Sequence, residues 1–511
     1  MATTEPDSTA IRRVVIAGGG TAGWMAAAAM SRTLGKLLDI VLVESDEIGT
    51  VGVGEATIPT LVTFHRLLDI KEQEFMAATQ ATFKLGISFE NWRDVGRDYI
   101  HSFGTTGKDH WSAGFQHFWR KGRERGLAGD YGDYCLELKA ALEHRFAHLP
   151  RGGMNYAFHM DAGLYARWLR GFSERFGVRR IEGKVVEVLA DREAQRIHAL
   201  KLESGDTIEG DLFIDCTGFR GLLIAQALGA EWEDWSHWLF CDSAIAVQTA
   251  SVGDPVPYTR SIARDAGWQW RIPLQHRVGN GIVYGSRFTD DDSARATLLG
   301  NLEGETLTEP RTIRFRPGQR RDTWRGNCIA LGLASGFLEP IESTSIHLIQ
   351  RGVIRLLQMF PALGISQADI DEYNAQTRDE IEHIRDFIVL HYHVTERRDS
   401  AFWRACADLD IPASLRHRID LFRDTGRVFR FPNELFAENS WIQVMLGQGI
   451  EPRSHHPAAD LMPDTELSRF LGDIKAGVDH TVRQLPSHAA YLATYCPAGE
   501  PTSPRSAADA R

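Results

Sequence analysis

Apolar and polar positions at the start of the chain predict short buried strands alternating with a helix. The apolar run Val14–Ala17 predicts a strand, and Asp39–Glu44 predicts a second one. Between them, Trp24–Met30 is rich in helix-forming residues. The turn Gly18–Gly23 joins the first strand to this helix. The order of strand, turn, helix and strand indicates an α/β fold.

The glycine turn has the spacing of a dinucleotide-binding site. Gly18 permits the tight turn, Gly20 lets the backbone approach a pyrophosphate, and Gly23 allows the helix to pack closely on the strand. The N-terminus of the helix would face the phosphate charge. Glu44 ends the second strand about 20 residues after the turn, where a carboxylate that binds ribose belongs. We therefore expect these residues, with Ala22 of the same turn, to bind a nucleotide.

Further along the chain, the pattern predicts a helix, a hairpin and a helical C-terminal third. The segment from Tyr156 to Trp168 is interpreted as a helix, and 185–189 and 199–202 as the strands of a hairpin. From about residue 350 to 485 the apolar spacing is helical, with a period near 3.6 between Ala375 and Val389.

Composition indicates a soluble, cytoplasmic enzyme. The chain has 511 residues, of which 43% are hydrophobic and 24% charged, and no apolar run is long enough to span a bilayer. The net charge of −11 disfavours a nucleic-acid partner. Six cysteines are scattered without metal-site or disulfide spacing, so no metal is expected. Residues 1–13 lack the apolar stretch of a secretory signal.

Several segments allow both a structural and a chemical interpretation from residue types alone. The pair Trp268 and Trp270 in W-x-W-x-I-P fits one face of a buried strand. Lys84, flanked by apolar residues, fits a side chain that extends its amine to solvent. The glycine-rich segment 49–59 fits a surface loop, or backbone that approaches a ligand.

Together, these segments resemble flavin-dependent tryptophan halogenases. The resemblance extends from Ile11 to Pro452 and is carried by separate motifs in the family's order. The motifs are the glycine turn, the V-G-E-A-T-x-P segment containing Ala56 and Thr57, K-x-G-x-x-F-x-x-W from Lys84, W-x-W-x-I-P from Trp268, and Ile341–Ile346, which is similar to P-L-E-S-T-G.

The resemblance implies an α/β fold with a glutathione-reductase-type FAD-binding region, interleaved with a substrate-side sheet. Asp215–Gly218 resembles the second nucleotide-contact element of such flavoproteins, although a plain strand and turn also fits. The third FAD segment would end its strand at Gly332. The implied division is a disordered N-terminus (1–10), an FAD-binding and halogenase core (11–350), a helical substrate-covering region (351–485) and a disordered tail (486–511).

The resemblance also implies that halide, rather than the organic substrate, is oxidised at the flavin. Trp268 and Trp270 would lie beside the flavin and keep the substrate away. The resulting hypohalous acid would reach Lys84, which either hydrogen-bonds it as a cation or, as a desolvated amine, becomes a haloamine. Glu342 would be the acid or base partner of Lys84, with Ser343 as its neighbour.

Halide and substrate contacts follow from the same resemblance. Backbone amides of Thr344 and Ser345 would bind halide, although an ordinary helix cap fits as well. Ser345 replaces the family's usual glycine, which predicts an altered halide preference. His101 and Phe103 would line the substrate pocket, or else are half-buried strand residues.

The substrate is expected to differ from free tryptophan. Ser440 and Trp441 stand where the family has a tyrosine pair that holds the amino acid. This favours free indole or another electron-rich aromatic, with Trp441 as a pocket wall, and peptide-borne tryptophan is a further alternative.

The chain has no second nicotinamide-binding motif, so we expect a separate NAD(P)H-dependent flavin reductase to supply FADH2. The enzyme itself is expected to be a monomer or a homodimer. The competing functions are an aromatic monooxygenase and a non-catalytic FAD sensor.

Overall fold

The first sheet of the structure contains the predicted N-terminal strands. The computed structural model describes residues 10–48, 54–150, 153–361 and 364–497. The strand order of this sheet is β20-β21-β12-β1-β2-β8, and all neighbours except β20 and β21 are parallel. The strands are β1 (Arg13–Ala17), β2 (Asp39–Glu44), β8 (Arg179–Glu182), β12 (Leu212–Asp215), β20 (Trp324–Arg325) and β21 (Cys328–Ala330). The sheet therefore joins strands from three distant parts of the chain, as the interleaved fold predicts.

The second sheet carries the tryptophan pair. Its order is β18-β14-β17-β16-β15-β5-β6, with mostly antiparallel neighbours. The strands are β5 (Gly86–Asp94), β6 (Arg97–Ser102), β14 (Ser243–Thr249), β15 (Thr259–Arg264), β16 (Gly267–Pro273), β17 (Val278–Tyr284) and β18 (Arg311–Arg314). Every residue of β16 is buried, and neighbouring strands pair with both of its edges.

Three smaller sheets complete the strand structure among the described residues, with the orders β3-β7-β4, β11-β10-β9 and β13-β19-β22. Their strands are β3 (Gly54–Ala56), β4 (Thr82–Lys84), β7 (Ala157–Asp161), β9 (Val185–Asp191), β10 (Arg196–Leu202), β11 (Thr207–Glu209), β13 (Trp232–Asp234), β19 (Gly318–Arg320) and β22 (Gly336–Phe337). The predicted hairpin is β9 and β10.

The prediction of one helix from Tyr156 to Trp168 is wrong in its first part. Residues 157–161 form β7, and helix α6 begins only after Asp161, whose carboxylate accepts a hydrogen bond from the Leu164 amide at 2.9 Å. Pairing with β3 and β4 on its two edges satisfies the backbone of β7 as a strand. A local apolar pattern does not contain this tertiary pairing.

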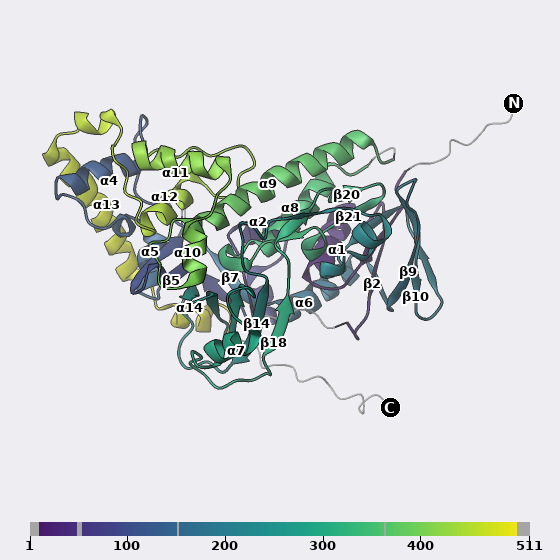
Figure 1. The fold of residues 1–511 in the computed structure, drawn as a ribbon. Helices are drawn as coiled ribbons and strands as arrows, with labels where there is room; N and C mark the ends of the chain where they lie inside the picture. The colour runs from purple at the N-terminus through teal and green to yellow at the C-terminus, as the bar shows by residue number, and fades with distance from the viewer. Residues whose placement is uncertain (1–9, 49–53, 151–152, 362–363, 498–511) are drawn as a thin grey trace.

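Helices cover the first sheet and build the far end of the molecule. Figure 1 shows the long α9 passing from the first sheet towards a group of helices that includes α4, α11, α12 and α13, while β9 and β10 lie at the opposite end. The helices are α1 (Thr21–Leu34), α2 (Thr60–Leu67), α3 (Glu72–Thr79), α4 (Phe115–Glu124), α5 (Leu136–Leu142), α6 (Ala162–Arg175), α7 (Asp291–Leu299), α8 (Ser345–Gln358), α9 (Gln367–His393), α10 (Ala401–Ala407), α11 (Ala413–Thr425), α12 (Glu438–Gly447), α13 (Asp464–Gln484) and α14 (His488–Tyr495). The short helices are η1 (Tyr131–Tyr134), η2 (Gly218–Arg220), η3 (Leu222–Ala227), η4 (Gly332–Ala334), η5 (Pro340–Glu342) and η6 (Pro457–Leu461).

Two of the predicted domain boundaries need correction. A boundary at 350 would cut α8, which continues to Gln358. A disordered tail from 486 conflicts with α14, where the buried His488 side chain accepts a hydrogen bond from the Phe83 amide at 3.2 Å. This contact ties the C-terminal helix to β4. The predicted disorder at 1–9 and 498–511 lies outside the described residues.

Two classes of feature are absent from the described residues. No helix there combines the length and the apolar character needed to cross a membrane. Nor does that part of the chain contain a cluster of side chains suited to hold a metal ion.

Candidate active site

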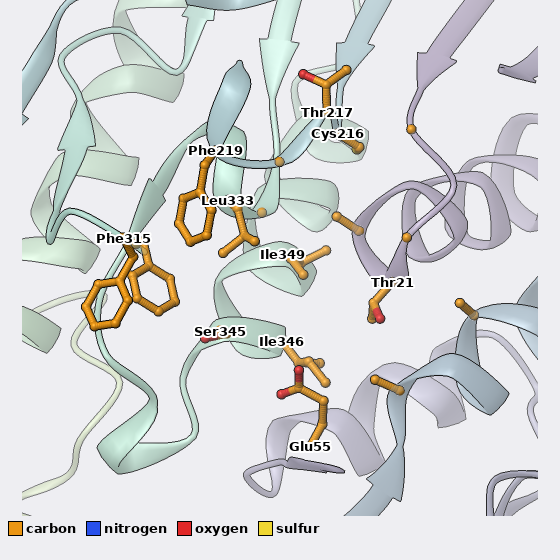
Figure 2. Close-up of a pocket in the computed structure, with 18 of the residues that line it drawn as sticks. Thr21, Glu55, Cys216, Thr217, Phe219, Phe315, Leu333, Ser345, Ile346 and Ile349 are labelled. Atoms are coloured by element: carbon orange, nitrogen blue, oxygen red, sulfur yellow. The ribbon is translucent and has the colours of Figure 1, made fainter. Parts of the chain in front are cut away.

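The carboxyl ends of β1 and β2 open into a cavity of about 430 Å³. In Figure 2, Phe219 and Phe315 lie on one side of this cavity and Thr21 on the other. Ser345 and Ile346, at the start of α8, lie between them. The wall includes these residues that the sequence predicts to bind: Gly18, Gly20, Ala22, Glu44, Ala56, Gly218, Trp268, Trp270, Gly332, Ser343 and Ser345. Most of the predicted flavin and halide residues therefore share one cavity.

The glycine turn fits a nucleotide phosphate. A Cβ atom placed on Gly20 would meet no atom within 4 Å, so the backbone there faces open space. Gly20 also caps α1, whose first turn contains no acidic residue and so presents unopposed amide dipoles. Gly23 lies outside the cavity wall, and a Cβ there would lie 1.9 Å from the Gly18 carbonyl oxygen. Gly20 thus leaves room for the ligand, and Gly23 leaves room for α1 against β1.

Glu44 lies at the cavity wall and is oriented by a cation. Its carboxylate accepts a hydrogen bond from Arg180 Nε at 2.5 Å, and Arg180 lies on the neighbouring strand β8. A Cβ atom placed on Gly19 would lie 1.4 Å from Glu44 Oε2, so the carboxylate packs directly against the glycine turn. This position suits the predicted hydrogen bond to a ribose hydroxyl.

Asp215 supports the second nucleotide element without facing the cavity. Its buried carboxylate accepts hydrogen bonds from the Thr217, Leu223 and Ile224 amides at 2.8–2.9 Å. These bonds fix the turn whose residues Thr217 and Gly218 line the cavity.

The tryptophan pair forms the inner wall of the cavity. Trp268 Nε1 donates a hydrogen bond to Glu339 Oε2 at 2.8 Å, and the Tyr392 hydroxyl donates to the same oxygen at 2.5 Å. Burial raises the Glu339 pKa to about 7, even though these hydrogen bonds favour the charged form. Glu339 is a functional residue that the sequence motifs do not predict, although it is a second carboxylate three residues before Glu342.

Lys84 lies just behind the cavity wall. Its amine is fully buried and donates hydrogen bonds to the Ser343 hydroxyl at 2.8 Å and to the Thr57 carbonyl oxygen at 3.0 Å. It also lies 5.2 Å from the centre of the Phe103 ring. Burial lowers the Lys84 pKa to about 7, although the charge of Glu342 opposes this shift. The prediction of an amine extended to solvent is therefore wrong.

Glu342 pairs with histidines rather than directly with Lys84. His101 Nδ1 lies 3.0 Å from each carboxylate oxygen, and His391 Nε2 lies 2.8 Å from Oε1. Burial alone would raise the Glu342 pKa, but His101 and His391 outweigh it and the pKa falls to about 2. His391, which lies in the buried run near the end of α9, is not predicted by any of the sequence motifs.

Ser343, Thr344 and Ser345 form the turn between η5 and α8. Ser343 has a left-handed backbone with φ of 59°, which turns the chain before the helix. The Thr344 hydroxyl is buried and has no hydrogen-bond partner within the described part of the chain. Because the first amides of an α-helix have no partner inside the helix, this turn is suited to hold an anion at the cavity wall.

Trp441 is held inside the helical region. Its Nε1 donates to Glu434 Oε1 at 2.9 Å, and the Arg418 guanidinium lies 4.0 Å from its ring centre. The ring also packs edge-on against Phe387, at 4.8 Å. Trp441 is 1% exposed and is not among the residues that line the cavity.

Comparison with known proteins identifies the family. A sequence model described as tryptophan halogenase matches residues 13–464. The chain belongs to the tryptophan halogenase family. A 7-chloro-L-tryptophan 6-halogenase from Kutzneria is 36% identical to this family member over 94% of the chain and 99% of the relative.

Solved structures agree with this family assignment. A flavin-dependent halogenase from Xanthomonas campestris is 69% identical, with a TM-score of 0.95 over 96% of this chain and 100% of that one. BrvH, a flavin-dependent halogenase from Brevundimonas, is 45% identical, with a TM-score of 0.91 over 95% and 99%. This tryptophan halogenase family member is thus a flavin-dependent halogenase, with the predicted α/β FAD-binding fold and helical C-terminal region.

Proposed function

We propose that this halogenase oxidises bromide or chloride and transfers the halogen to an indole or a related electron-rich aromatic. The observation that carries the proposal is the position of Lys84. Its buried amine contacts Ser343, and Ser343 lines the cavity although Lys84 does not. An oxidised halogen leaving the cavity would therefore meet Ser343 and Lys84.

The residues at the cavity fit FAD. Gly20 and the α1 amides would hold its phosphates, Glu44 its ribose, and Trp268 and Trp270 would border its ring system. Bound FADH2, together with oxygen, would supply the oxidising power for the halide. A separate NAD(P)H-dependent flavin reductase would supply the FADH2. Neighbouring amides of Thr344 and Ser345 would bind halide, because helix-start amides carry partial positive charge.

Ser345 is proposed to set halide preference. Its side chain is at the cavity wall, at a position that is usually glycine in the family. A hydroxymethyl group there changes the space and backbone freedom around the anion. Competition between bromide and chloride should give a different product ratio for Ser345→Gly than for the parent; an unchanged ratio would discard the idea.

The substrate is proposed to be held by aromatic contacts rather than by its amino-acid group. Trp441 replaces one residue of the expected tyrosine pair, and its polar atom is already bonded to Glu434. We propose that His101, Phe103 and the helical region around Trp441 enclose the aromatic ring. The second candidate is free tryptophan, which is favoured by relatives named tryptophan 6-halogenase and tryptophan 7-halogenase and by the Kutzneria relative named for 7-chloro-L-tryptophan.

Product mass tests the proposal. The protein is combined with FAD, a flavin reductase, NADH and oxygen, with bromide or chloride, and with indole, L-tryptophan or a tryptophan-containing peptide. We expect a bromine or chlorine isotope pattern, strongest with indole. A product that gains only oxygen would support the monooxygenase, and absence of any product despite bound FAD would support the sensor.

A further inference from the structure

The two ring nitrogens of His101 have very different surroundings. The side chain is 2% exposed and lies on β6, two residues before Phe103. Nδ1 lies 3.0 Å from both oxygens of Glu342. Nε2 is buried, and none of the described residues offers it a hydrogen-bond partner. A buried polar atom without a partner costs about 1–3 kcal/mol, which points to a ligand or a reacting group at this nitrogen.

Glu342 fixes which nitrogen of His101 carries hydrogen. The Glu342 pKa is held near 2, because its histidine neighbours outweigh burial, so this carboxylate is ionised at neutral pH. An ionised carboxylate only accepts hydrogen bonds, so Nδ1 must carry the hydrogen. In a neutral imidazole the other nitrogen, Nε2, then presents a lone pair.

Glu342 is less suited to accept a proton, because both of its oxygens lie 3.0 Å from His101 Nδ1 and Oε1 also lies 2.8 Å from His391 Nε2. Imidazole is the side-chain class suited to take up protons near neutral pH. Among the described residues, His391 Nε2 also makes no well-directed hydrogen bond, but it lies 2.8 Å from Glu342 Oε1. Because His391 Nδ1 lies 2.8 Å from the Tyr99 hydroxyl, both nitrogens of His391 face protein groups, unlike those of His101.

His101 also has a suitable position relative to Lys84. The Phe103 ring lies 5.2 Å from the Lys84 amine, and the Phe103 amide donates to the Leu85 carbonyl oxygen at 2.9 Å. His101 is two residues earlier, near the end of β6, which is about 7 Å along an extended chain. Phe387 and Phe436 pack around the His101 ring, with centroids at 5.5 and 6.1 Å. A flat aromatic substrate at this apolar wall could therefore face Lys84 with one part and His101 with another.

We propose that His101 Nε2, rather than the Glu342 carboxylate, accepts the proton that leaves the aromatic ring during halogenation. The inference rests on the proposed function. The ring's π electrons attack the halogen carried at Lys84 as hypohalous acid or as a haloamine. The oxygen–halogen or nitrogen–halogen bond breaks, its electron pair stays on that oxygen or nitrogen, and the ring becomes a cation with a new carbon–halogen bond. The carbon–hydrogen bond at that carbon then breaks, its electron pair restores aromaticity, and the proton goes to the Nε2 lone pair. The resulting imidazolium is balanced by Glu342, much as a carboxylate supports histidine in a catalytic triad.

A deuterium isotope effect tests this role. Single-turnover rates are measured in separate reactions with indole and with indole deuterated at every ring carbon, for the parent, His101→Gln and Glu342→Gln. Glutamine at position 101 can still donate a hydrogen bond to Glu342 but has no basic nitrogen. Glutamine at position 342 can donate to His101 Nδ1, so the imidazole hydrogen moves to Nε2 and that nitrogen can no longer accept a proton. We expect both variants to slow halogenation by about 100-fold or more and to raise the isotope effect from about 1 to about 2 or more.

Phe103→Leu is the matched control, since it changes the substrate wall without touching a proton-transfer group. We expect it to lower the rate without raising the isotope effect. Each variant should keep the melting temperature and FAD affinity of the parent, so that a slower rate reports on chemistry. If His101→Gln fails to fold, His101→Phe replaces it in the comparison. Slower variants with an isotope effect still near 1 would overturn the proposal, whereas absence of halogenated product from the parent would refute the proposed function instead.

Discussion

Ser343 joins Lys84 to the cavity: its hydroxyl oxygen accepts a hydrogen bond from Lys84 Nζ at 2.8 Å, and the same residue lines the cavity wall. The amine is otherwise anchored only to the Thr57 carbonyl oxygen among its described hydrogen-bond partners. Ser343 adopts its left-handed backbone in the turn before α8. The turn therefore fixes the position of the Lys84 amine relative to the cavity.

Ser343→Ala should weaken halogenation without weakening flavin binding. The change removes one of the two acceptors that orient the Lys84 amine, and a hydrogen bond to a charged group contributes about 1.5–3 kcal/mol. We expect a fall in kcat of about 10- to 100-fold, with the FAD dissociation constant unchanged. Steady-state kinetics and flavin titration check this result; an unaffected kcat would show that the contact does not position the amine.

Lys84 should titrate near pH 7 instead of near 10.5. Because burial lowers its pKa, the amine is an ammonium below about pH 7 and neutral above it. We expect the single-turnover halogenation rate to bend near pH 7, falling with rising pH if the ammonium is the working form and rising if the neutral amine is. Lys84→Arg, which stays charged, should show no bend. A parent profile without a bend near 7 would contradict the burial argument.

Two glycines of the first turn should separate ligand binding from folding. Gly20→Ala places a methyl group in open space, so we expect an unchanged melting temperature and at least a tenfold weaker affinity for FAD. Gly23→Ala places it 1.9 Å from the Gly18 carbonyl oxygen, so we expect a clear loss of stability. Thermal unfolding of the flavin-free proteins and flavin titration distinguish the two; equal loss of stability would remove the distinction.

Glu339→Gln should change how stability depends on pH. In the folded protein the Glu339 pKa is about 7, whereas an ordinary glutamate has a pKa of 4.5. The protonated side chain therefore adds its full contribution to folding stability below pH 4.5, and this contribution is lost as the pH rises through 7. Over that range the loss is about 3 kcal/mol. Glutamine cannot ionise and still accepts from Trp268 and Tyr392. Urea unfolding at pH 5 and pH 8 should show the parent losing more stability than the variant; parallel losses would count against a protonated Glu339.

The motif residues could be predicted because their chemistry is carried by short segments. Gly20, Glu44 and Ser343 all line one cavity. Gly20 caps α1, Glu44 ends β2 and Ser343 lies in the turn just before α8, and a local pattern reveals positions of these kinds. Lys84 was predicted as a functional residue only through the resemblance, because its apolar neighbours alone favoured an exposed amine.

Residues that act through tertiary contacts could not be predicted in this way. His391 meets Glu342 only because α9 packs beside the η5 turn, and Glu339 meets Tyr392 for the same reason. The strand β7 depends on pairing with β3 and β4, and α14 on the contact between His488 and β4. In each case the decisive partner is distant in sequence, and local propensity contains no information about it.

The proposed transfer of halogen by Lys84 is tested most directly by comparing two buried lysines. Lys121 is also buried, and its amine donates to the Ala459 and Met462 carbonyl oxygens. None of these three residues lines the cavity. With bromide, FAD and reductase, mass spectrometry should show brominated aromatic from the parent and from Lys121→Met, and a loss of about 1,000-fold or more from Lys84→Met with FAD affinity retained. Bromination by Lys84→Met at the parent's rate would contradict the account.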